Sequence, residues 1–281
     1  MAITVPRRRP KDPEGRMPLR AHLAELRNRL VKAGLAIIVG AVAGWFVYDF
    51  LFEALQRPLE LAAEATGTDI KLNFTDPTSP FNLQLKLSVY VGVVLASPVW
   101  LYQLWAFILP GLTKKERGYA LGFSFFAVLL FLGGLGLAWM ILPNALEFFA
   151  GFVPEGSVAF NTIDAYFSFV TRLMLSFGVA FVVPLILVGT NMMGMLSAHQ
   201  MAKGWRVAVF LCFLFAAMAS PTAEVSMMFL LALPMVFLYL VAVGVAWFVD
   251  RRRAKAADRA LADGEASEID APEAIDRPDA L

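Results

Sequence analysis

Apolar residues along this chain form long blocks separated by short polar intervals. A helix needs roughly 20 mostly apolar residues to cross a hydrocarbon core of about 30 Å, because backbone groups in lipid must bond within the segment. The last block is too long for one crossing and contains Ser220-Pro221-Thr222-Ala223-Glu224, which predicts the turn of a helical hairpin. The pattern predicts six spans, at about residues 31–52, 85–109, 119–142, 166–193, 205–219 and 225–249.

Several features predict that these spans are bent and closely packed. The span at 205–219 is shorter than a usual crossing, so we expect a thinner membrane at the turn after it. Proline usually kinks a membrane helix, and prolines fall inside the spans at Pro98, Pro184 and Pro234. Glycine permits close helix contact, here at Gly133, Gly134 and Gly136. The expected fold is an all-α polytopic membrane protein whose kinked helices form a concave bundle.

Charged residues orient the spans, because lysine and arginine in short loops stay on the cytoplasmic side. Basic residues crowd the N-terminal arm and the intervals 114–117, 199–206 and 251–255, whereas the intervals 53–80 and 143–165 are mainly acidic. Both termini are therefore expected in the cytoplasm. The predicted organisation is a basic cytoplasmic arm at 1–18, retained rather than cleaved, a membrane domain at 19–250 and a disordered cytoplasmic tail at 251–281.

Composition supports a membrane protein and argues against covalent catalysis. Hydrophobic residues make up 59% of the 281 residues, above the ~45–50% of a soluble domain. The single cysteine, Cys212, allows no intrachain disulfide, and the two histidines, His22 and His199, lie outside the spans. No phosphate-binding loop or metal-ligand spacing is present. We expect no enzymatic activity, cofactor, metal site or nucleic-acid partner.

Two functions without covalent catalysis remain open at this stage. A small-solute or ion secondary transporter usually carries ionisable residues deep in the bilayer, and here the only charge well inside a span is Arg172, which can snorkel to the interface. Such a transporter would show substrate-dependent flux. A passive membrane scaffold would tolerate replacement of Glu25 and Glu116 together without loss of activity.

Two cytoplasmic segments each contain one acid among basic residues. Residues 22–30 have leucines at helical spacing, which predicts a short amphipathic helix lying on the membrane before the first span, and Glu25 is its acid. In the second segment Pro110-Gly111 ends a helix, and Glu116 precedes the next. From spacing alone, Glu25 could pair with Arg29 and Glu116 could complement a helix N-terminus, each for about 0.3–0.5 kcal/mol.

An ordered set of motifs from about residue 17 to 250 resembles the TatC family, the polytopic subunit of the twin-arginine protein translocase. The matches are His-Leu-x-Glu-Leu-Arg-x-Arg-Leu at 22–30, Pro58 in the first outer loop, Ser79-Pro80-Phe81, Ser97-Pro98, Tyr102-Gln103-x-Trp105-Ala106-Phe107-x-x-Pro110-Gly111-Leu112, Glu116-Arg117, Ser168-Phe169, Phe177-Gly178-Val179-x-Phe181-x-x-Pro184, Ser220-Pro221 and Ala232-Leu233-Pro234-Met235.

The resemblance implies a receptor in the bacterial cytoplasmic membrane. It would bind Arg-Arg signal peptides of folded precursor proteins and assemble with single-span TatA/TatB-type subunits and further copies of itself, for export driven by the proton-motive force. Glu25 and Glu116 match the family's signal-binding acids. Phe107, Pro110 and Gly111 would shape the same patch, supported by Arg27, Arg29 and Gln103.

Weaker implications concern the outer side and one departure from the family pattern. By resemblance, Pro58 and Phe81 help to shape an outer cap, and the fifth span offers an edge to a single-span partner; simple folding constraints explain both residues equally well. Glu224 matches an acid at the last outer turn, or is a helix-start charge. Many relatives carry glutamate or glutamine where this chain has Val182, so transport through a buried carboxylate there is in doubt.

Overall fold

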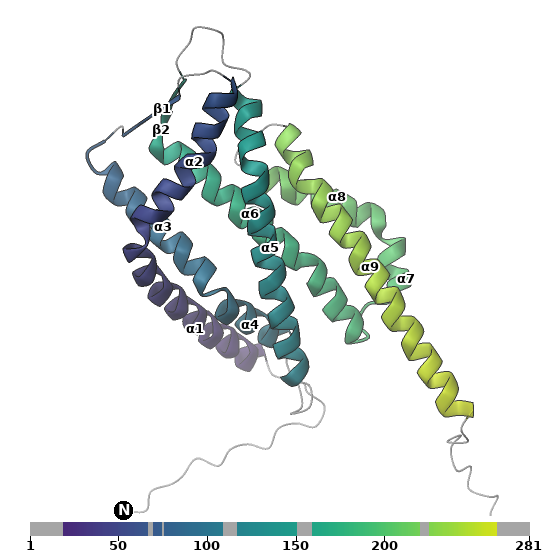
Figure 1. Ribbon diagram of the computed structural model, residues 1–281. Helices are drawn as coiled ribbons and strands as arrows, with labels where there is room; N and C mark the ends of the chain where they lie inside the picture. The colour runs from purple at the N-terminus through teal and green to yellow at the C-terminus, as the bar shows by residue number, and fades with distance from the viewer. Residues whose placement is uncertain are drawn as a thin grey trace, which may run out of the picture.

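The computed structural model describes residues 19–66, 70–74, 76–108, 117–150, 159–219 and 225–262. These residues form a tilted helical bundle with one small sheet at one end (Figure 1). The elements are α1 (Leu19–Phe46), α2 (Tyr48–Thr66), β1 (Ile70–Asn73), α3 (Ser79–Leu95), α4 (Ser97–Ile108), α5 (Arg117–Ala150), β2 (Ala159–Thr162), α6 (Ile163–Met192), α7 (Ala198–Lys203), α8 (Trp205–Ala219) and α9 (Val225–Ala262).

The helices confirm an all-helical polytopic membrane fold. Among the described residues, four helical stretches are long and apolar enough to cross a membrane: His22–Phe46, Leu121–Phe149, Ile163–Met192 and Met228–Arg259. The number of candidate spans rises to five if α3 and α4, which are bent by 58° relative to each other, are counted together as one broken span. The short apolar helix α8 has the bounds predicted for the fifth span, 205–219.

The kink expected near Pro98 lies at Ala96, between α3 and α4. Ala96 is the C-cap residue of α3, and its backbone N–H donates to the Gly92 carbonyl at 2.9 Å. Ser97 and Pro98 then begin α4, where a missing N–H is tolerated because first-turn donors have no partner within the helix. By contrast, α6 and α9 run past Pro184 and Pro234 as single helices.

Two predictions for the N-terminal part of the chain were wrong. Residues 22–30 are not a separate surface helix, because α1 continues without a break into the first span. Pro58 does not lie in a loop but inside α2, where it is buried. A helix forms there because Leu55, Leu59 and Ala62 recur at helical spacing and are buried, although acids separate them in the sequence.

The C-terminal helix is longer than predicted. α9 continues through residues 251–262, which the sequence analysis assigned to a disordered tail. Asp250 accepts hydrogen bonds from Asn191 Nδ2 at 3.1 Å and from the backbone N–H of Ala198 at 2.7 Å. Arg253 donates to the carbonyl of Asn191 at 3.1 Å. Two of these bonds satisfy backbone groups, at the end of α6 and the start of α7, and all three connect α9 to these helices.

The small sheet was not predicted. β1 and β2 pair in parallel, with Ile70 opposite Ala159 and Asn73 opposite Thr162. Four-residue strands offer too few alternations for a period-two pattern to stand out. Each strand leads towards a helix of the bundle, β1 to α3 and β2 to α6, so the pairing sets these two helix starts at the same end of the molecule (Figure 1).

Glycines mark the closest helix contacts. A Cβ at Gly134 would lie 2.5 Å from the Phe177 carbonyl oxygen, so α5 and α6 touch there backbone to backbone. The predicted contact does not extend to Gly133 or Gly136, where a Cβ would meet nothing within 4 Å. A second close crossing, which the sequence analysis missed, joins α1 and α3 through Gly40, Gly44 and Gly92.

Adjacent glycines in α5 provide a matched test of this packing. Gly134→Ala should destabilise the protein by about 1–3 kcal/mol, because the new methyl group meets backbone that cannot rotate away. Gly133→Ala should be neutral or stabilising by up to about 1 kcal/mol, since helix propensity favours alanine. Unfolding of both purified variants in one detergent would measure the difference. Equal stability would contradict the predicted contact.

Candidate functional site

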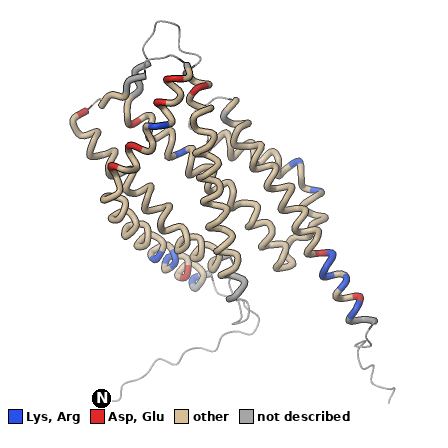
Figure 2. Tube along the Cα trace, viewed as in Figure 1, with Lys and Arg blue, Asp and Glu red and all other residues tan. Residues whose placement is uncertain are grey.

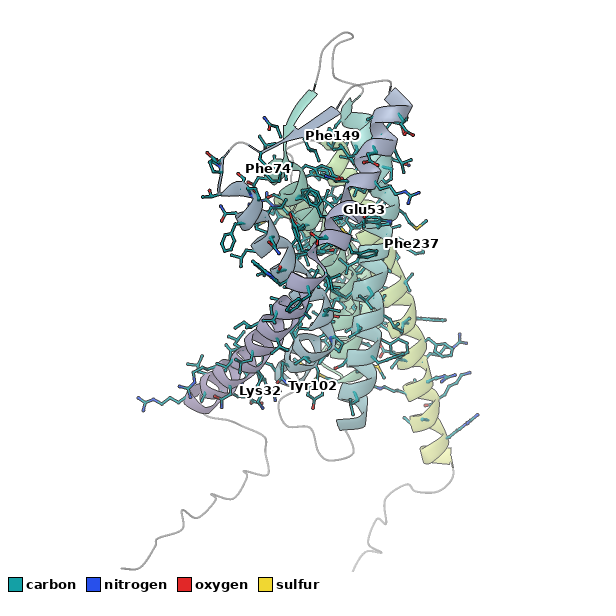
Figure 3. All side chains as sticks on the ribbon, turned by 60° about the vertical axis from the view of Figure 1, so that its left-hand side comes forward. Lys32, Glu53, Phe74, Tyr102, Phe149 and Phe237 are labelled. Atoms are coloured by element: carbon teal, nitrogen blue, oxygen red, sulfur yellow. The ribbon has the colours of Figure 1, made fainter. Side chains whose placement is uncertain are left out.

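The side chains that the sequence analysis selected on the first and second spans meet where α1 packs against α4. We use the name α1–α4 patch for His22, Glu25 and Arg29 of α1 together with Gln103 and Phe107 of α4. α1 packs along both α3 and α4, so the bend at Ala96 directs α4 across the N-terminal half of α1. In Figure 3 the labelled Lys32 and Tyr102 mark this end of the two helices.

Arg29 links the two helices through its guanidinium group. Its Nε donates to Glu25 Oε1 at 3.0 Å, and its Nη2 donates to the same oxygen. Its Nη1 reaches Gln103 Oε1 at 3.4 Å. The side chains of Arg29 and Glu25 are 22% and 26% exposed, so solvent reaches the pair. The ordinary i,i+4 pairing considered from the sequence is therefore present, with an additional bond to α4.

An aromatic contact closes the other side of the patch. The ring of His22 stacks on Phe107, with centroids 4.5 Å apart and planes inclined by 16°. Sequence analysis selected Phe107 but gave His22 no role, although His22 opens the same motif as Glu25. The helix predicted over residues 22–30 already placed His22 one turn before Glu25, and this spacing was the signal that could have identified it.

Four candidate residues, Pro110, Gly111, Glu116 and Glu224, lie outside the described residues. α4 ends at Ile108, one residue after Phe107, and α5 begins at Arg117, directly after Glu116 in the sequence. Arg27 is exposed on α1.

Pro58 and Phe81 are not part of the α1–α4 patch. Phe81 lies on α3, where its exposed ring meets Trp45 edge-on at a centroid distance of 6.1 Å. Trp45 is twenty residues beyond Glu25 on the same helix, which corresponds to about 30 Å along its axis. Pro58 lies further along the chain, in α2. These residues therefore belong to the opposite end of the bundle.

At the position where this chain departs from the family pattern, the side chain is apolar and buried. Val182 lies on α6 and is 4% exposed, within the apolar core. Among the described residues no group of three or more His, Cys, Asp or Glu side chains could hold a metal ion.

Comparisons with known proteins agree with this architecture. Residues 21–234 match the family profile described as Sec-independent protein translocase protein (TatC). The chain belongs to the TatC family. The TatC protein of Xylanimonas cellulosilytica is 51% identical over 237 residues, which cover 84% of this chain and 86% of that protein. That of Rothia mucilaginosa is 37% identical over 257 residues, covering 91% and 86%.

A solved TatC structure extends the match to three dimensions. A crystal structure of the twin arginine translocase receptor TatC superposes with a TM-score of 0.70 at 31% identity, covering 80% of this chain and 99% of the other. The resemblance seen in the sequence motifs is thereby confirmed. This TatC chain is a receptor subunit of the twin-arginine translocase, a multi-pass membrane protein, and a transport component rather than an enzyme.

Proposed function

We propose that the α1–α4 patch, completed by Glu116, binds the paired arginines of signal peptides on folded precursor proteins. The single observation that carries this proposal is the contact between Glu25 and Arg29. A partly exposed carboxylate here already accepts two bonds from one guanidinium group, so the local geometry suits an arginine fork. In the empty receptor Arg29 takes the place that an incoming arginine would occupy.

The chemistry of the patch favours arginine over lysine. Guanidinium is planar and donates from several nitrogens at fixed angles, whereas ammonium is a compact charge that cannot form the bidentate arrangement. Two carboxylates, Glu25 and Glu116, would meet two adjacent arginines. The stacked rings of His22 and Phe107 would form an apolar wall beside them. Nearby bases such as Arg27 and Lys32 would disfavour cations that lack this geometry.

Charge distribution supports an orientation with both termini in the cytoplasm. Most of the described basic residues gather at the start of α1 and the end of α9, at one end of the bundle (Figure 2). Most described acids lie on α2 and near the starts of α3 and α6, at the other end. By the positive-inside rule the patch then faces the cytoplasm of a bacterial cell, where precursors are synthesised.

A single-span partner would have a suitable apolar surface beside α8. A cavity of about 710 Å³ lies between α6, α8 and α9. Exposed apolar side chains continue along α8, among them Val207, Phe210 and Leu211. Shape complementarity and small residues would have to supply the affinity there, since burial from lipid gives little driving force. Further copies of this chain and export driven by the proton-motive force remain part of this proposal.

The function is tested by changing the peptide rather than the receptor. A radiolabelled Arg-Arg signal peptide carrying a photo-crosslinker should label the wild-type protein in membranes at least tenfold more than the matched Lys-Lys peptide. The reason is the loss of charge-assisted bonds contributing about 1.5–3 kcal/mol each. Equal labelling by both peptides would mean that the patch does not select arginine, and would favour a scaffold. Substrate-dependent flux through the isolated protein would instead favour a transporter.

A further inference from the structure

A second charged site lies between α3 and α6, away from the α1–α4 patch. A cavity of about 560 Å³ opens there. Its polar lining includes Lys86, Ser168 and Arg172, and its apolar lining includes Leu85, Val89, Val93 and Leu175. A cavity with cationic and hydroxyl groups beside an aliphatic wall suits an amphiphilic anion.

Both cations lie at a similar depth from the same end of the bundle. α3 and α6 begin beside the paired strands β1 and β2, and both run away from that sheet (Figure 1). Lys86 is seven residues after the start of α3, and Arg172 is nine residues after the start of α6. At a rise of 1.5 Å per residue these offsets correspond to about 10 and about 14 Å along the two helices.

The two cations differ in how their charge is balanced. Lys86 Nζ lies 2.8 Å from Asp164 Oδ1, so that pair is neutral within the protein. Arg172 is exposed and forms no hydrogen bond or ion pair with any described residue. An arginine in a membrane span is unfavourable without a partner, so an anionic counter-ion would stabilise Arg172. The cavity therefore has a net positive charge from one guanidinium group.

We propose that this cavity binds the phosphate of one anionic phospholipid from the leaflet on the β1–β2 side. The guanidinium of Arg172 would donate a bidentate pair of hydrogen bonds to the phosphate, and the Ser168 hydroxyl, one turn earlier, would donate a third. An acyl chain would lie on the aliphatic wall of α3. The Thr171 hydroxyl is not available, because it donates to the Phe167 carbonyl at 2.7 Å.

The same geometry predicts selectivity among phosphate-bearing molecules. A zwitterionic lipid has the phosphate but adds a cation, which a site of net charge +1 does not favour. A soluble phosphate ester has the anion but cannot use the aliphatic wall. An anionic phospholipid satisfies both parts of the cavity, consistent with basic pockets between spans serving as lipid-headgroup sites. The site is independent of signal-peptide binding at the α1–α4 patch.

Native mass spectrometry of the purified protein tests the proposal with three probes: phosphatidylglycerol, phosphatidylcholine and glycerol phosphate. The wild type should retain one phosphatidylglycerol at least tenfold better than either other probe. Arg172→Gln should lose that preference at least tenfold. Arg206→Gln should keep it, because Arg206 lies over the Trp205 ring at the start of α8, outside the cavity.

Ser168→Ala is the second test variant, used if Arg172→Gln fails to fold. It should reduce retention of phosphatidylglycerol several-fold. Equal retention of the two lipids would overturn the proposal, as would unchanged retention in Arg172→Gln or in Ser168→Ala. Binding of glycerol phosphate as strong as that of phosphatidylglycerol would instead identify a soluble-anion site.

Discussion

Glu25→Gln should weaken crosslinking of an Arg-Arg signal peptide about ten- to a hundredfold while leaving the protein inserted and folded. Glutamine keeps the shape of the side chain and removes its charge. The lost charge-assisted bonds to an incoming guanidinium contribute about 1.5–3 kcal/mol, and each 1.4 kcal/mol is a factor of ten in affinity. Folding should change little, because a solvent-accessible i,i+4 pair of this kind contributes only about 0.3–0.5 kcal/mol.

The companion variant Arg29→Gln separates recognition from helix stability. If Arg29 only binds the Glu25 carboxylate until a peptide displaces it, its removal should leave peptide binding unchanged or strengthen it about twofold. A twofold change corresponds to the free energy of the Glu25–Arg29 pair, which the peptide would no longer have to break. If instead the Glu25–Arg29 pair matters only for the structure of α1, both variants should weaken crosslinking equally. Weaker crosslinking of Arg29→Gln would therefore identify a structural role of the pair, whereas unchanged or stronger crosslinking would identify Arg29 as a group that the peptide displaces.

Glu64→Gln provides the control for a general loss of negative charge. Glu64 is an exposed acid near the C-terminal end of α2, and that end of the helix lies at the opposite end of the bundle from the α1–α4 patch (Figure 1). It should bind the Arg-Arg peptide as the wild type does. Unchanged crosslinking in Glu25→Gln would show that Glu25 is an ordinary surface charge, and that the arginines bind elsewhere.

The sequence predicted the membrane helices because lipid imposes a simple rule on them. A span must be long, apolar and internally hydrogen-bonded, so the apolar blocks overlap described helices. The block at 31–52 nevertheless runs across the break at Val47, and the block at 85–109 runs across the bend at Ala96. The sequence analysis did not predict α2, because this helix is amphipathic rather than continuously apolar. Acids such as Glu53, Glu60 and Glu64 separate its buried leucines along the sequence. Its helical period was present in the sequence but was read as a polar loop.

The candidate site was predictable in part. Motif resemblance selected Glu25, Arg29, Gln103 and Phe107, which the structure brings together on α1 and α4. It also selected Pro58 and Phe81, which lie at the other end of the bundle. Resemblance identifies residues that a family shares, whereas the distance between them depends on helix crossings. Those crossings depend on small residues whose partners are far away in the sequence, as at Gly40 and Gly92.

The crossing of α1 and α3 should be the helix contact in this fold that is least tolerant of a larger side chain. A Cβ at Gly92 would lie 2.5 Å from the Ile37 carbonyl oxygen and 2.6 Å from the Ala41 nitrogen. Both are backbone atoms of α1, so no side chain can rotate to make room. Overpacking usually costs about 1–3 kcal/mol, and Gly92→Leu should reach or exceed the upper end because the two helix axes must separate.

Separation of α1 from α3 should also affect recognition, because α1 carries Glu25 and α4 continues from α3. The 3.4 Å hydrogen bond from Arg29 to Gln103 joins α1 to α4, so such a shift should break it. Gly92→Leu should therefore lower the unfolding temperature in detergent and reduce Arg-Arg crosslinking together. Gly34→Leu is the matched control on α1, since a Cβ there meets nothing within 4 Å. If Gly92→Leu were as stable as Gly34→Leu, α1 and α3 would not be in contact at this glycine.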